Sequence, residues 1–580
     1  MINKYIDYYK ATFKGEIFEK VKRKLLIKMN IFEKKKELKE VELELCCNFK
    51  KNNFRKKIGE NRFRIFNKYL NIENLNWKDF KNGKKWYLEN LKDYGDIKEI
   101  WEINRLQFLP LLILNNKEEL AKNILNEWIE KNPYNIGINW NNNLEVAIRG
   151  ISLINFYILL KDKNLNYEKL IYLHGLHIYN DIKYSEKCIP NNHVIGEAAT
   201  LYCISKFLKF SENKKWEEKA KRILKTYSNH LHIDGTYEEA SLSYHRFVLQ
   251  MYIMVFLFSK KSNDNFLEDE ILEKLKRATI FLKSIEKPNK NYPDFGDNDE
   301  GMFYKLDYNM AFYNFVESLN SLFEKEKKGE IKLLEEIYDI KLNNKEEYEK
   351  IDKQNIFNIG KYFVYRQKEN YFFIHNQKQI YHSHSDGMAM ELMLNGKEIL
   401  IDSGTYNYNI DINKRKYYRG TLSHNTVYLN EDQSKQIGSF RWINSSQNLF
   451  ETKEELDNFF IKGSNILKNK KEHIRKINLE KDFKKIEVKD IIKNTDKFII
   501  SWIFSSEIKT INKISEKEIS LNNNEIVLNI ETKDKIEVNI VDAYISLGYN
   551  QEILVKKLEI KNIENKKEYI ITSIFKIGEI

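Results

Sequence analysis

Histidines and carboxylates that could bind a metal or transfer protons gather in one stretch of the chain. His382 and His384 are separated by a single serine, and Asp402 and His424 follow them. Imidazole and carboxylate groups bind borderline metals and move protons near neutral pH. Two histidines and a carboxylate can hold Zn²⁺ and leave its fourth position to water or substrate. Ordinary polar sheet residues are the alternative, and the clustering favours a site.

A predicted β-hairpin would bring these residues together. Two strand-like runs, residues 388–394 and 397–401, flank an Asn-Gly pair. Asn-Gly suits the positive φ angles of a tight hairpin turn. Asp402 ends the return strand and is expected near His384. If His382 and His384 lie on a strand, they face the same side of it.

Asparagine and histidine also precede a predicted helix in the first half of the chain. The run Asn191-Asn192-His193 is followed by Glu197. Such a polar cluster suits a functional site, but paired asparagines before a helix also serve as an N-cap. Both interpretations stay open.

Three further runs combine polar and aromatic residues. Tyr244 lies near the start of a predicted helix, where it could either pack or belong to a polar cluster. Glu145 and Arg149 are four residues apart, a spacing that a plain helical ion pair would also give. Residues 293–301 are acidic and punctuated by glycine, but their spacing does not fit an EF-hand loop. We expect this run to be a loop that borders a cleft.

Composition limits the classes of partner. The 580 residues are too many for one ordinary core, so two or three domains are expected. The net charge of +12 comes from basic and acidic residues that are interspersed. That pattern fits solubility, or attraction to an anionic partner such as an acidic polysaccharide. No nucleic-acid-binding module or arginine-rich stripe occurs, so we expect no nucleic-acid partner.

Apolar runs in the chain are short. The longest, residues 251–258, is well below the length of a membrane span. Residues 25–27 are too few for the apolar region of a signal peptide. The sequence therefore predicts a soluble, cytoplasmic protein without a membrane span.

The periodicity of apolar residues changes once along the chain. Residues 1–85 read as a mixed, partly helical N-terminal segment. Residues 86–345 have a helical period, which predicts an array of α-hairpins or an α/α toroid. Residues 346–580 contain many short strands without helices between them, which predicts an antiparallel β-sandwich. The expected fold is thus multidomain α+β.

Taken together and in this order, the motifs resemble those of the heparinase II/III family of polysaccharide lyases. They are Asn-Asn-His with Glu197, the Asp-Gly-Thr-Tyr run that leads to Tyr244, His-Ser-His-Ser-Asp, Ile-Asp-Ser-Gly-Thr-Tyr and Ser-His-Asn-Thr. The resemblance covers about residues 95 to 450. It implies an α/α toroid followed by an antiparallel β-sandwich, with the active site between them.

The resemblance also implies a reaction, β-elimination beside a uronic acid. Donors that neutralise the uronate carboxylate make its C5 proton acidic enough for a base to remove. By resemblance, Asn192 and His193 hold the carboxylate, and Tyr244 acts as base or acid. His382 assists or is the alternative base, and Asn191 competes with Asn192 for the amide role.

The remaining roles are also implied by resemblance. The family's zinc positions match His384, Asp402 and His424, with zinc mainly organising the β-domain side of the cleft. Substrate-binding positions match Glu145, Arg149, Glu197 and Asn191. The expected partner is an anionic polysaccharide or oligosaccharide, and a homodimer is one possible assembly.

Two other functions are compatible with the sequence. One is a non-catalytic protein on the same scaffold that binds glycans or takes part in surface-polysaccharide biosynthesis. The other is a metal-dependent hydrolase that activates water at the zinc-like triad.

Overall fold

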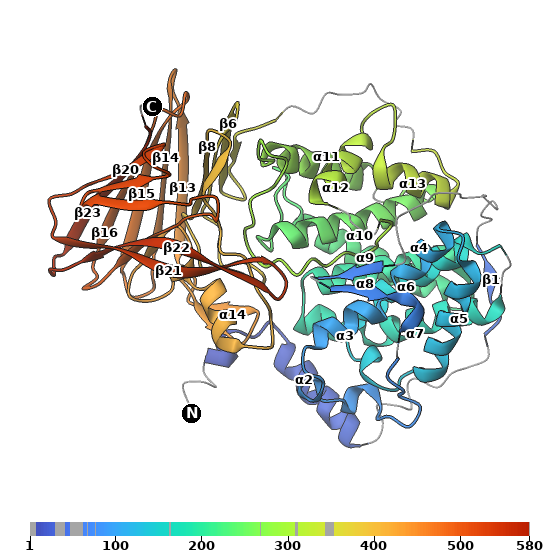
Figure 1. Ribbon diagram of the computed structural model, residues 1–580. Coiled ribbons are helices and arrows are strands. Elements are labelled where there is room, and N and C mark those ends of the chain that lie inside the picture. Colours follow the sequence, from blue (N-terminus) through green and yellow to red (C-terminus); the bar gives the residue numbers. More distant parts are fainter. Residues whose placement is uncertain are drawn as a thin grey trace.

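A computed structural model describes residues 7–29, 41–46, 62–66, 68–75, 77–161, 164–266, 268–307, 311–342 and 353–578. Its helices and strands separate into two halves (Figure 1). The domain boundary predicted at residue 345 lies outside the described residues, so it stays a prediction. No described helix is long and apolar enough to cross a membrane.

The first half is an α/α toroid. Its helices are α3 (Ile97–Asn104), α4 (Phe108–Leu114), α5 (Glu118–Lys131), α6 (Asn143–Leu159), α7 (Leu165–Cys188), α8 (Asn192–Phe207), α9 (Asn213–Tyr227), α10 (Leu242–Lys261), α11 (Glu268–Ser284), α12 (Phe312–Ser321) and α13 (Gly329–Tyr338). Helix α8 packs against both α6 and α10, and all three are buried along almost their whole length. Helices α5 and α9 have one apolar face each, as expected of an outer layer. The predicted helical period is confirmed.

The second half is an antiparallel β-sandwich. One sheet has the order β13-β14-β15-β16-β23-β20-β19-β18. Its strands are β13 (Gln447–Glu454), β14 (Asn458–Ile466), β15 (Glu472–Glu480), β16 (Lys485–Lys493), β18 (Ile511–Ser515), β19 (Glu518–Leu521), β20 (Ile526–Glu531) and β23 (Glu568–Ile577). Alternate residues of β16 are buried, which is the pattern of a strand with one face on a core.

Two smaller sheets form the opposite layer. Strands β5 (Ile356–Phe357), β6 (Tyr362–Gln367), β7 (Asn370–His375), β8 (Met390–Leu394) and β9 (Lys397–Leu400) pair in chain order. Strands β10 (Val427–Tyr428), β17 (Ile499–Ile503), β22 (Gln551–Asn562) and β21 (Ile536–Gly548) make the second sheet. A bridge between Leu400 and Phe504 joins the two sheets at their edges. Side chains from all three sheets share one apolar core.

The predicted Asn-Gly hairpin is present, but the histidines before it are not on a strand. Asn395 and Gly396 turn the chain between β8 and β9 with φ of 51° and 75°. His382 and His384 instead lie in the loop between β7 and β8. Tyr381 has a φ of 42°, which a regular strand does not allow. Alternation along a strand therefore does not set the direction of either histidine.

The N-terminal segment contacts both halves. Helix α2 (Glu16–Lys28) packs against α7 of the toroid. Its buried Glu16 accepts two hydrogen bonds from Arg441, at 2.8 and 2.9 Å, on the short strand β12 (Arg441–Ile443). The beginning of the chain thus joins the toroid to the β-domain.

Candidate active site

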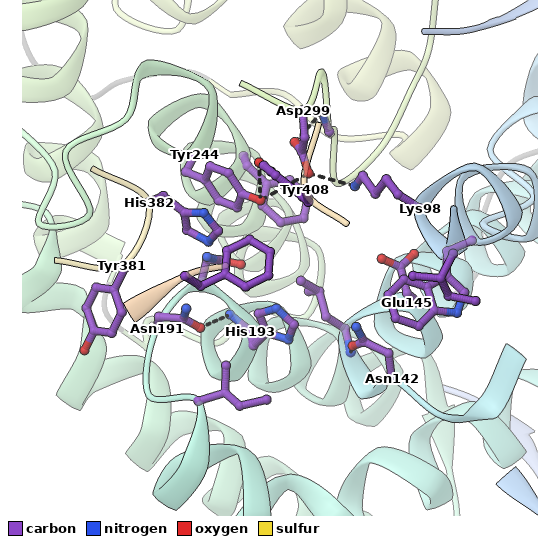
Figure 2. Close-up of a pocket in the computed structure, with 18 of the residues that line it drawn as sticks. Lys98, Asn142, Glu145, Asn191, His193, Tyr244, Asp299, Tyr381, His382 and Tyr408 are labelled. Carbon is purple, nitrogen blue, oxygen red and sulfur yellow. Dashed lines mark hydrogen bonds and ion pairs between the residues drawn. The ribbon is translucent and has the colours of Figure 1, made fainter. Parts of the chain in front are cut away.

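A cavity of about 360 Å³ lies where the two halves meet. Its walls come from the first turns of α6, α8 and α10, from α3, and from loops of the β-domain (Figure 2). Labelled in that view are Lys98, Asn142, Glu145, Asn191, His193, Tyr244, Asp299, Tyr381, His382 and Tyr408. Sequence positions far apart therefore form one site.

Helix N-caps position the toroid side of this cavity. Asn191 Oδ1 accepts a hydrogen bond from the backbone N–H of His193 at 3.1 Å, which starts α8. Ser241 Oγ accepts from the backbone N–H of Tyr244 at 3.2 Å, which starts α10. Because both helices begin at the cavity, side chains of their first turns face into it. Burial lowers the pKa of His193 to about 4.

Tyr244 lies flat against His382. Their ring centroids are 3.6 Å apart, with an angle of 12° between the planes. The Tyr244 hydroxyl donates to Asp299 Oδ2 at 3.1 Å and is 3.2 Å from the Tyr408 hydroxyl. Burial, reinforced by the charge of Asp299, raises the pKa of Tyr244 well above its ordinary value. The Tyr244 side chain is therefore a neutral phenol that can act as a proton donor.

One carboxylate, Asp297, holds both histidines of the β-domain loop. It lies 2.9 Å from His382 Nδ1 and 3.1 Å from His384 Nε2. Arg415 binds both of its oxygens, at 2.5 and 2.6 Å. Burial alone would raise the pKa of Asp297, but the charges of Arg415 and Arg419 hold it well below its usual range. Asp297 is thus ionised and accepts hydrogen bonds from both rings.

This arrangement selects the tautomer of each ring. Nδ1 of His382 donates to Asp297, which leaves the Nε2 lone pair for the cavity. That nitrogen is 3.7 Å from Glu239 Oε2, too far for a hydrogen bond. Nε2 of His384 donates to the other oxygen, so its Nδ1 is left buried without a partner among the described residues.

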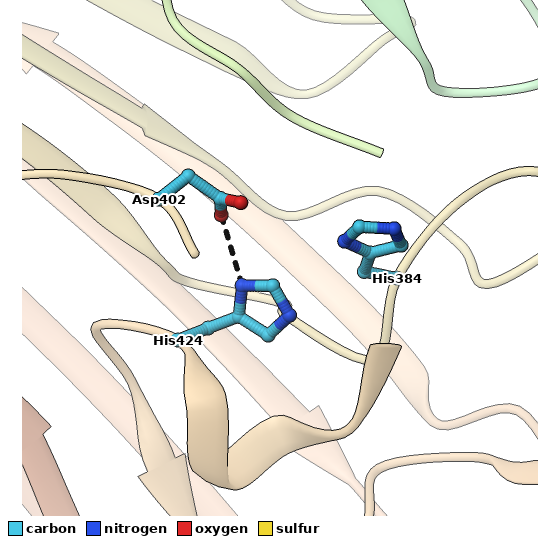
Figure 3. Close-up of side chains that lie close together, drawn as sticks. All are labelled: His384, Asp402 and His424. Atoms are coloured by element: carbon cyan, nitrogen blue, oxygen red, sulfur yellow. Dashed lines mark hydrogen bonds and ion pairs between the residues drawn. The ribbon is translucent and has the colours of Figure 1, made fainter. Parts of the chain in front are cut away.

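The predicted metal positions do come together (Figure 3). Ligand atoms of His384, Asp402 and His424 all lie within 4.8 Å of one another. His424 Nδ1 is 2.9 Å from Asp402 Oδ2, and its Nε2 donates to the backbone carbonyl of Tyr418 at 3.1 Å. The unpartnered Nδ1 of His384 belongs to the same group. Two imidazole nitrogens and a carboxylate oxygen, each oriented by a further hydrogen bond, fit a divalent metal ion.

The structure places the two asparagines differently. Asn192 is fully buried, and its backbone and side-chain N–H groups both donate to Glu239, at 2.7 and 2.8 Å. Asn192 also lines the cavity; one of its two amide hydrogens is bound to Glu239, and its Oδ1 has no partner among the described residues. Asn191 lines the cavity, and its Nδ2 has no hydrogen-bond partner among the described residues. Both asparagines therefore line the cavity, and the amide group of Asn191 has no bound hydrogen among the described residues, whereas that of Asn192 has one.

The predicted substrate-binding residues lie in three different places. Glu145 faces the cavity, but Arg105 binds it at 2.7 and 2.9 Å, so the helical pair expected with Arg149 is replaced. Arg149 is fully buried and does not line the cavity; its Nε donates to His174 at 2.9 Å. We therefore assign Arg149 no contact with substrate. Glu197 lines a neighbouring cavity.

Sequence reasoning missed four residues of the site. They are Asp297, Asp299, Tyr408 and Arg415. The acidic run at residues 293–301 was expected to border a cleft, and it supplies both aspartates. Nothing in the sequence marks Arg415, on helix α14 (Ile412–Arg419), as the partner of an aspartate more than one hundred residues upstream.

Models of two known protein-family domains match this chain. The model of the heparinase II/III N-terminus matches residues 2–327, and that of the heparinase II/III-like C-terminal domain matches residues 355–570. The chain belongs to the heparinase II/III family. No curated protein sequence matches the chain at a significant level.

Solved structures of heparinases share this fold. A crystal structure of heparinase III has a TM-score of 0.65 and 17% identity, over 86% of this chain and 80% of that one. The heparinase III BT4657 gene product has a TM-score of 0.59 and 15% identity, over 83% and 79%. Heparan sulfate lyase HepC from Pedobacter heparinus has a TM-score of 0.57 and 15% identity, over 95% and 88%. At these identities the likeness establishes the toroid-plus-sandwich fold.

Proposed function

We propose that this protein is a polysaccharide lyase that cleaves a uronate-containing polysaccharide or oligosaccharide by β-elimination. One observation carries the proposal: Tyr244, which has a proton to give, stacks on His382, whose Nε2 can accept one. A pair of opposite proton-transfer groups at one point of a cleft suits a reaction that removes one proton and delivers another.

The toroid side of the cavity offers donors for the uronate carboxylate. Asn191 Nδ2 is free, and His193 is a neutral imidazole at neutral pH because its pKa is about 4. Hydrogen bonds to the carboxylate stabilise the charge that develops on it when the C5 proton leaves. Asn192, which also lines the cavity, binds Glu239 through its backbone and side-chain N–H groups.

The proton transfers follow from the tautomers. His382 Nε2 takes the C5 proton, and Asp297 stabilises the imidazolium that results. The C4–O bond then breaks as the C4–C5 double bond forms, and the Tyr244 phenol protonates the leaving oxygen. Asp299 and Tyr408 hold the Tyr244 hydroxyl in place for this step.

His384, Asp402 and His424 would hold Zn²⁺ in this account. The ion would tie the loop that carries His382 to the sheet. His384 and His424 are at most 1% exposed, and none of the three lines the cavity, so the site suits a structural metal. The same burial counts against a hydrolase that would activate water at the metal.

Metal analysis tests the zinc assignment. We expect about one equivalent of zinc per chain in wild-type protein and loss of the metal in His424→Ala. Chelation should lower the melting temperature, and added zinc should restore it. A fully stable, fully active preparation without metal would refute this assignment.

Product analysis tests the reaction. Wild-type protein is incubated separately with heparan sulfate, hyaluronan, chondroitin and alginate, and ultraviolet absorbance is followed. Elimination creates an unsaturated uronate that absorbs in the ultraviolet, and mass spectrometry shows fragments without added water. Saturable binding with no product from any of these polymers would favour the non-catalytic alternative.

A further inference from the structure

The three metal-site residues come from three separate segments of the β-domain (Figure 3). His384 lies in the loop between β7 and β8, Asp402 follows β9, and His424 lies just before β10. The bond of 2.9 Å between His424 and Asp402 orients one side chain on another, but it does not fix the spacing of the three segments. That spacing must be set by contacts between their backbones and the rest of the domain.

The side chain of Asn425 joins two of these segments. It directly follows a histidine of the triad and is 1% exposed. Its Nδ2 donates to the backbone carbonyls of Met390, at 2.9 Å, and Ile401, at 2.8 Å, and Ile401 is the residue before Asp402. Its Oδ1 accepts from the backbone N–H of Ile503 at 2.6 Å. Asn425 therefore ties the His424 segment to the residue that precedes the carboxylate.

The guanidinium of Arg475, on β15, joins the third segment to the other two. Its Nη1 donates to the backbone carbonyls of Asn425 and Met388, both at 2.8 Å. Met388 lies four residues after His384 and has a φ of 65°. A non-glycine residue keeps this conformation only where surrounding contacts hold it. One nitrogen of Arg475 thus spans the segments that carry the two histidines.

Asp490, on β16, fixes the direction of this guanidinium. It accepts from Nε of Arg475 at 2.8 Å and from Nη2 at 3.1 Å, and also from His473 Nε2 at 2.7 Å. A two-pronged bond to a carboxylate sets the plane of a guanidinium as well as its position. The Trp502 ring centroid lies 4.8 Å from the guanidinium carbon. Both Arg475 and Asp490 are fully buried, so the whole arrangement is rigid.

We propose that Asn425 and Arg475 are positioning residues that hold the three ligand segments at the spacing a divalent metal ion requires. This role rests on the metal site of the proposed function. Neither residue is among the described residues that line the main cavity, so it is exercised through the ligands and not on the substrate. It also gives a purpose to the asparagine of the Ser-His-Asn-Thr motif, which the proposed reaction does not use.

Direct measurement of metal binding tests this role. Metal-stripped protein is titrated with Zn²⁺ in competition with a chromophoric chelator, and the Kd of each variant is compared with that of wild type. Asn425→Ala loses the bonds to both carbonyls. Arg475→Lys keeps a positive charge beside Asp490, but an ammonium cannot reproduce the fixed fork of a guanidinium. Each substitution should raise the Kd for Zn²⁺ by about 10–100-fold, as for other residues that orient metal ligands.

The absorption spectrum of the Co²⁺-loaded protein reports ligand geometry separately from stability. Both variants should have altered d–d bands, whereas a loss of stability alone leaves the bands of the folded protein unchanged. Arg149→Lys is the matched control. Arg149 is equally buried and also binds two backbone carbonyls, at 3.1 and 2.8 Å, but in the toroid. Its Kd for Zn²⁺ and its Co²⁺ spectrum should equal those of wild type.

A double variant keeps the test decisive if a single substitution does not fold. Arg475→Met with Asp490→Asn removes both charges of the buried pair, which often costs little stability, and leaves an acceptor for His473. Its Kd for Zn²⁺ should rise as in Arg475→Lys. Wild-type affinity and spectrum in the folded Asn425→Ala and double variants would overturn the proposal, as would an equal loss in Arg149→Lys. No Zn²⁺ binding by wild-type protein would instead refute the metal site itself, and this role with it.

Discussion

The two walls of the main cavity are built in different ways. On the toroid wall, Asn191 and Tyr244 owe their positions to helix starts, so each is set by hydrogen bonds within three residues of the chain. On the β-domain wall, His382 and His384 lie in an irregular loop. Asp297 and Arg415, from two other segments, hold them there.

The two walls should therefore differ in how well they tolerate the loss of a single side chain. A helix start survives the loss of one side chain because its other backbone bonds remain. The β-domain wall instead concentrates its bonds on one buried carboxylate. We therefore expect changes on the toroid wall to affect chemistry with little effect on the fold, and a change at Asp297 to affect chemistry, metal and stability together.

Tyr244→Phe should produce the largest loss of activity. It removes the proton donor but keeps the ring that stacks on His382, so kcat should fall by about 10²–10⁴-fold. Steady-state kinetics by ultraviolet absorbance measures this loss. The melting temperature should stay near that of wild type. Full retained activity would contradict the assigned role.

Asp297→Asn should disrupt the β-domain wall, because it removes the ionised carboxylate that binds both histidines. Both histidines lose their ionised partner, and metal affinity should fall by about 10–100-fold, as for other residues that orient metal ligands. Arg415 would be left with a buried, uncompensated charge, which costs about 3–5 kcal/mol. We would measure kcat, metal content and urea unfolding on the same preparation. A loss of stability with unchanged kcat and metal would mean that Asp297 has no positioning role.

Two substitutions of Asn191, on the toroid wall, separate its role as an amide donor from its role as a helix cap. Asn191→Ser keeps a capping oxygen but loses the amide donor, so kcat/KM should fall about tenfold, the value of one hydrogen bond of about 1.4 kcal/mol. Asn191→Ala should lose the same activity and also about 1 kcal/mol of stability, because the cap is gone. Kinetics and urea unfolding separate the two effects. If only the alanine variant loses activity, Asn191 acts through the cap alone.

Glu197 should affect stability and leave activity unchanged. Burial raises its pKa from 4.5 to about 8, so the folded protein keeps a proton that the unfolded chain releases in this range. The stability that the carboxyl gives is complete below pH 4.5 and is lost as the pH rises to about 8. Wild type should therefore lose up to about 1.4 kcal/mol per pH unit relative to Glu197→Gln. Parallel pH profiles in urea unfolding would contradict this.

The sequence predicted much of the fold because its signals are local. Helical periods, the Asn-Gly hairpin and the short strands each depend on neighbouring residues. Residues of the toroid wall were predicted for the same reason. Zinc, the glycan and a homodimer stay predictions.

The β-domain wall could be predicted only in part. The acidic run was recognised as a loop beside a cleft, but the sequence does not say which of its carboxylates faces which histidine. Tyr381, with its positive φ, takes the histidines out of the expected strand. Arg149 was predicted to bind substrate, and it does lie on the expected helix. Its side chain, however, donates to His174 and does not line the cavity.

We propose that Tyr244 and His382, from opposite walls of the cavity, together carry out an elimination. The most direct measurement is the mass of the products formed in heavy-oxygen water. Elimination predicts unsaturated fragments that contain no solvent oxygen, formed by wild type and not by Tyr244→Phe. Saturated fragments, with one heavy oxygen gained for each bond cleaved, would mean hydrolysis and would refute elimination.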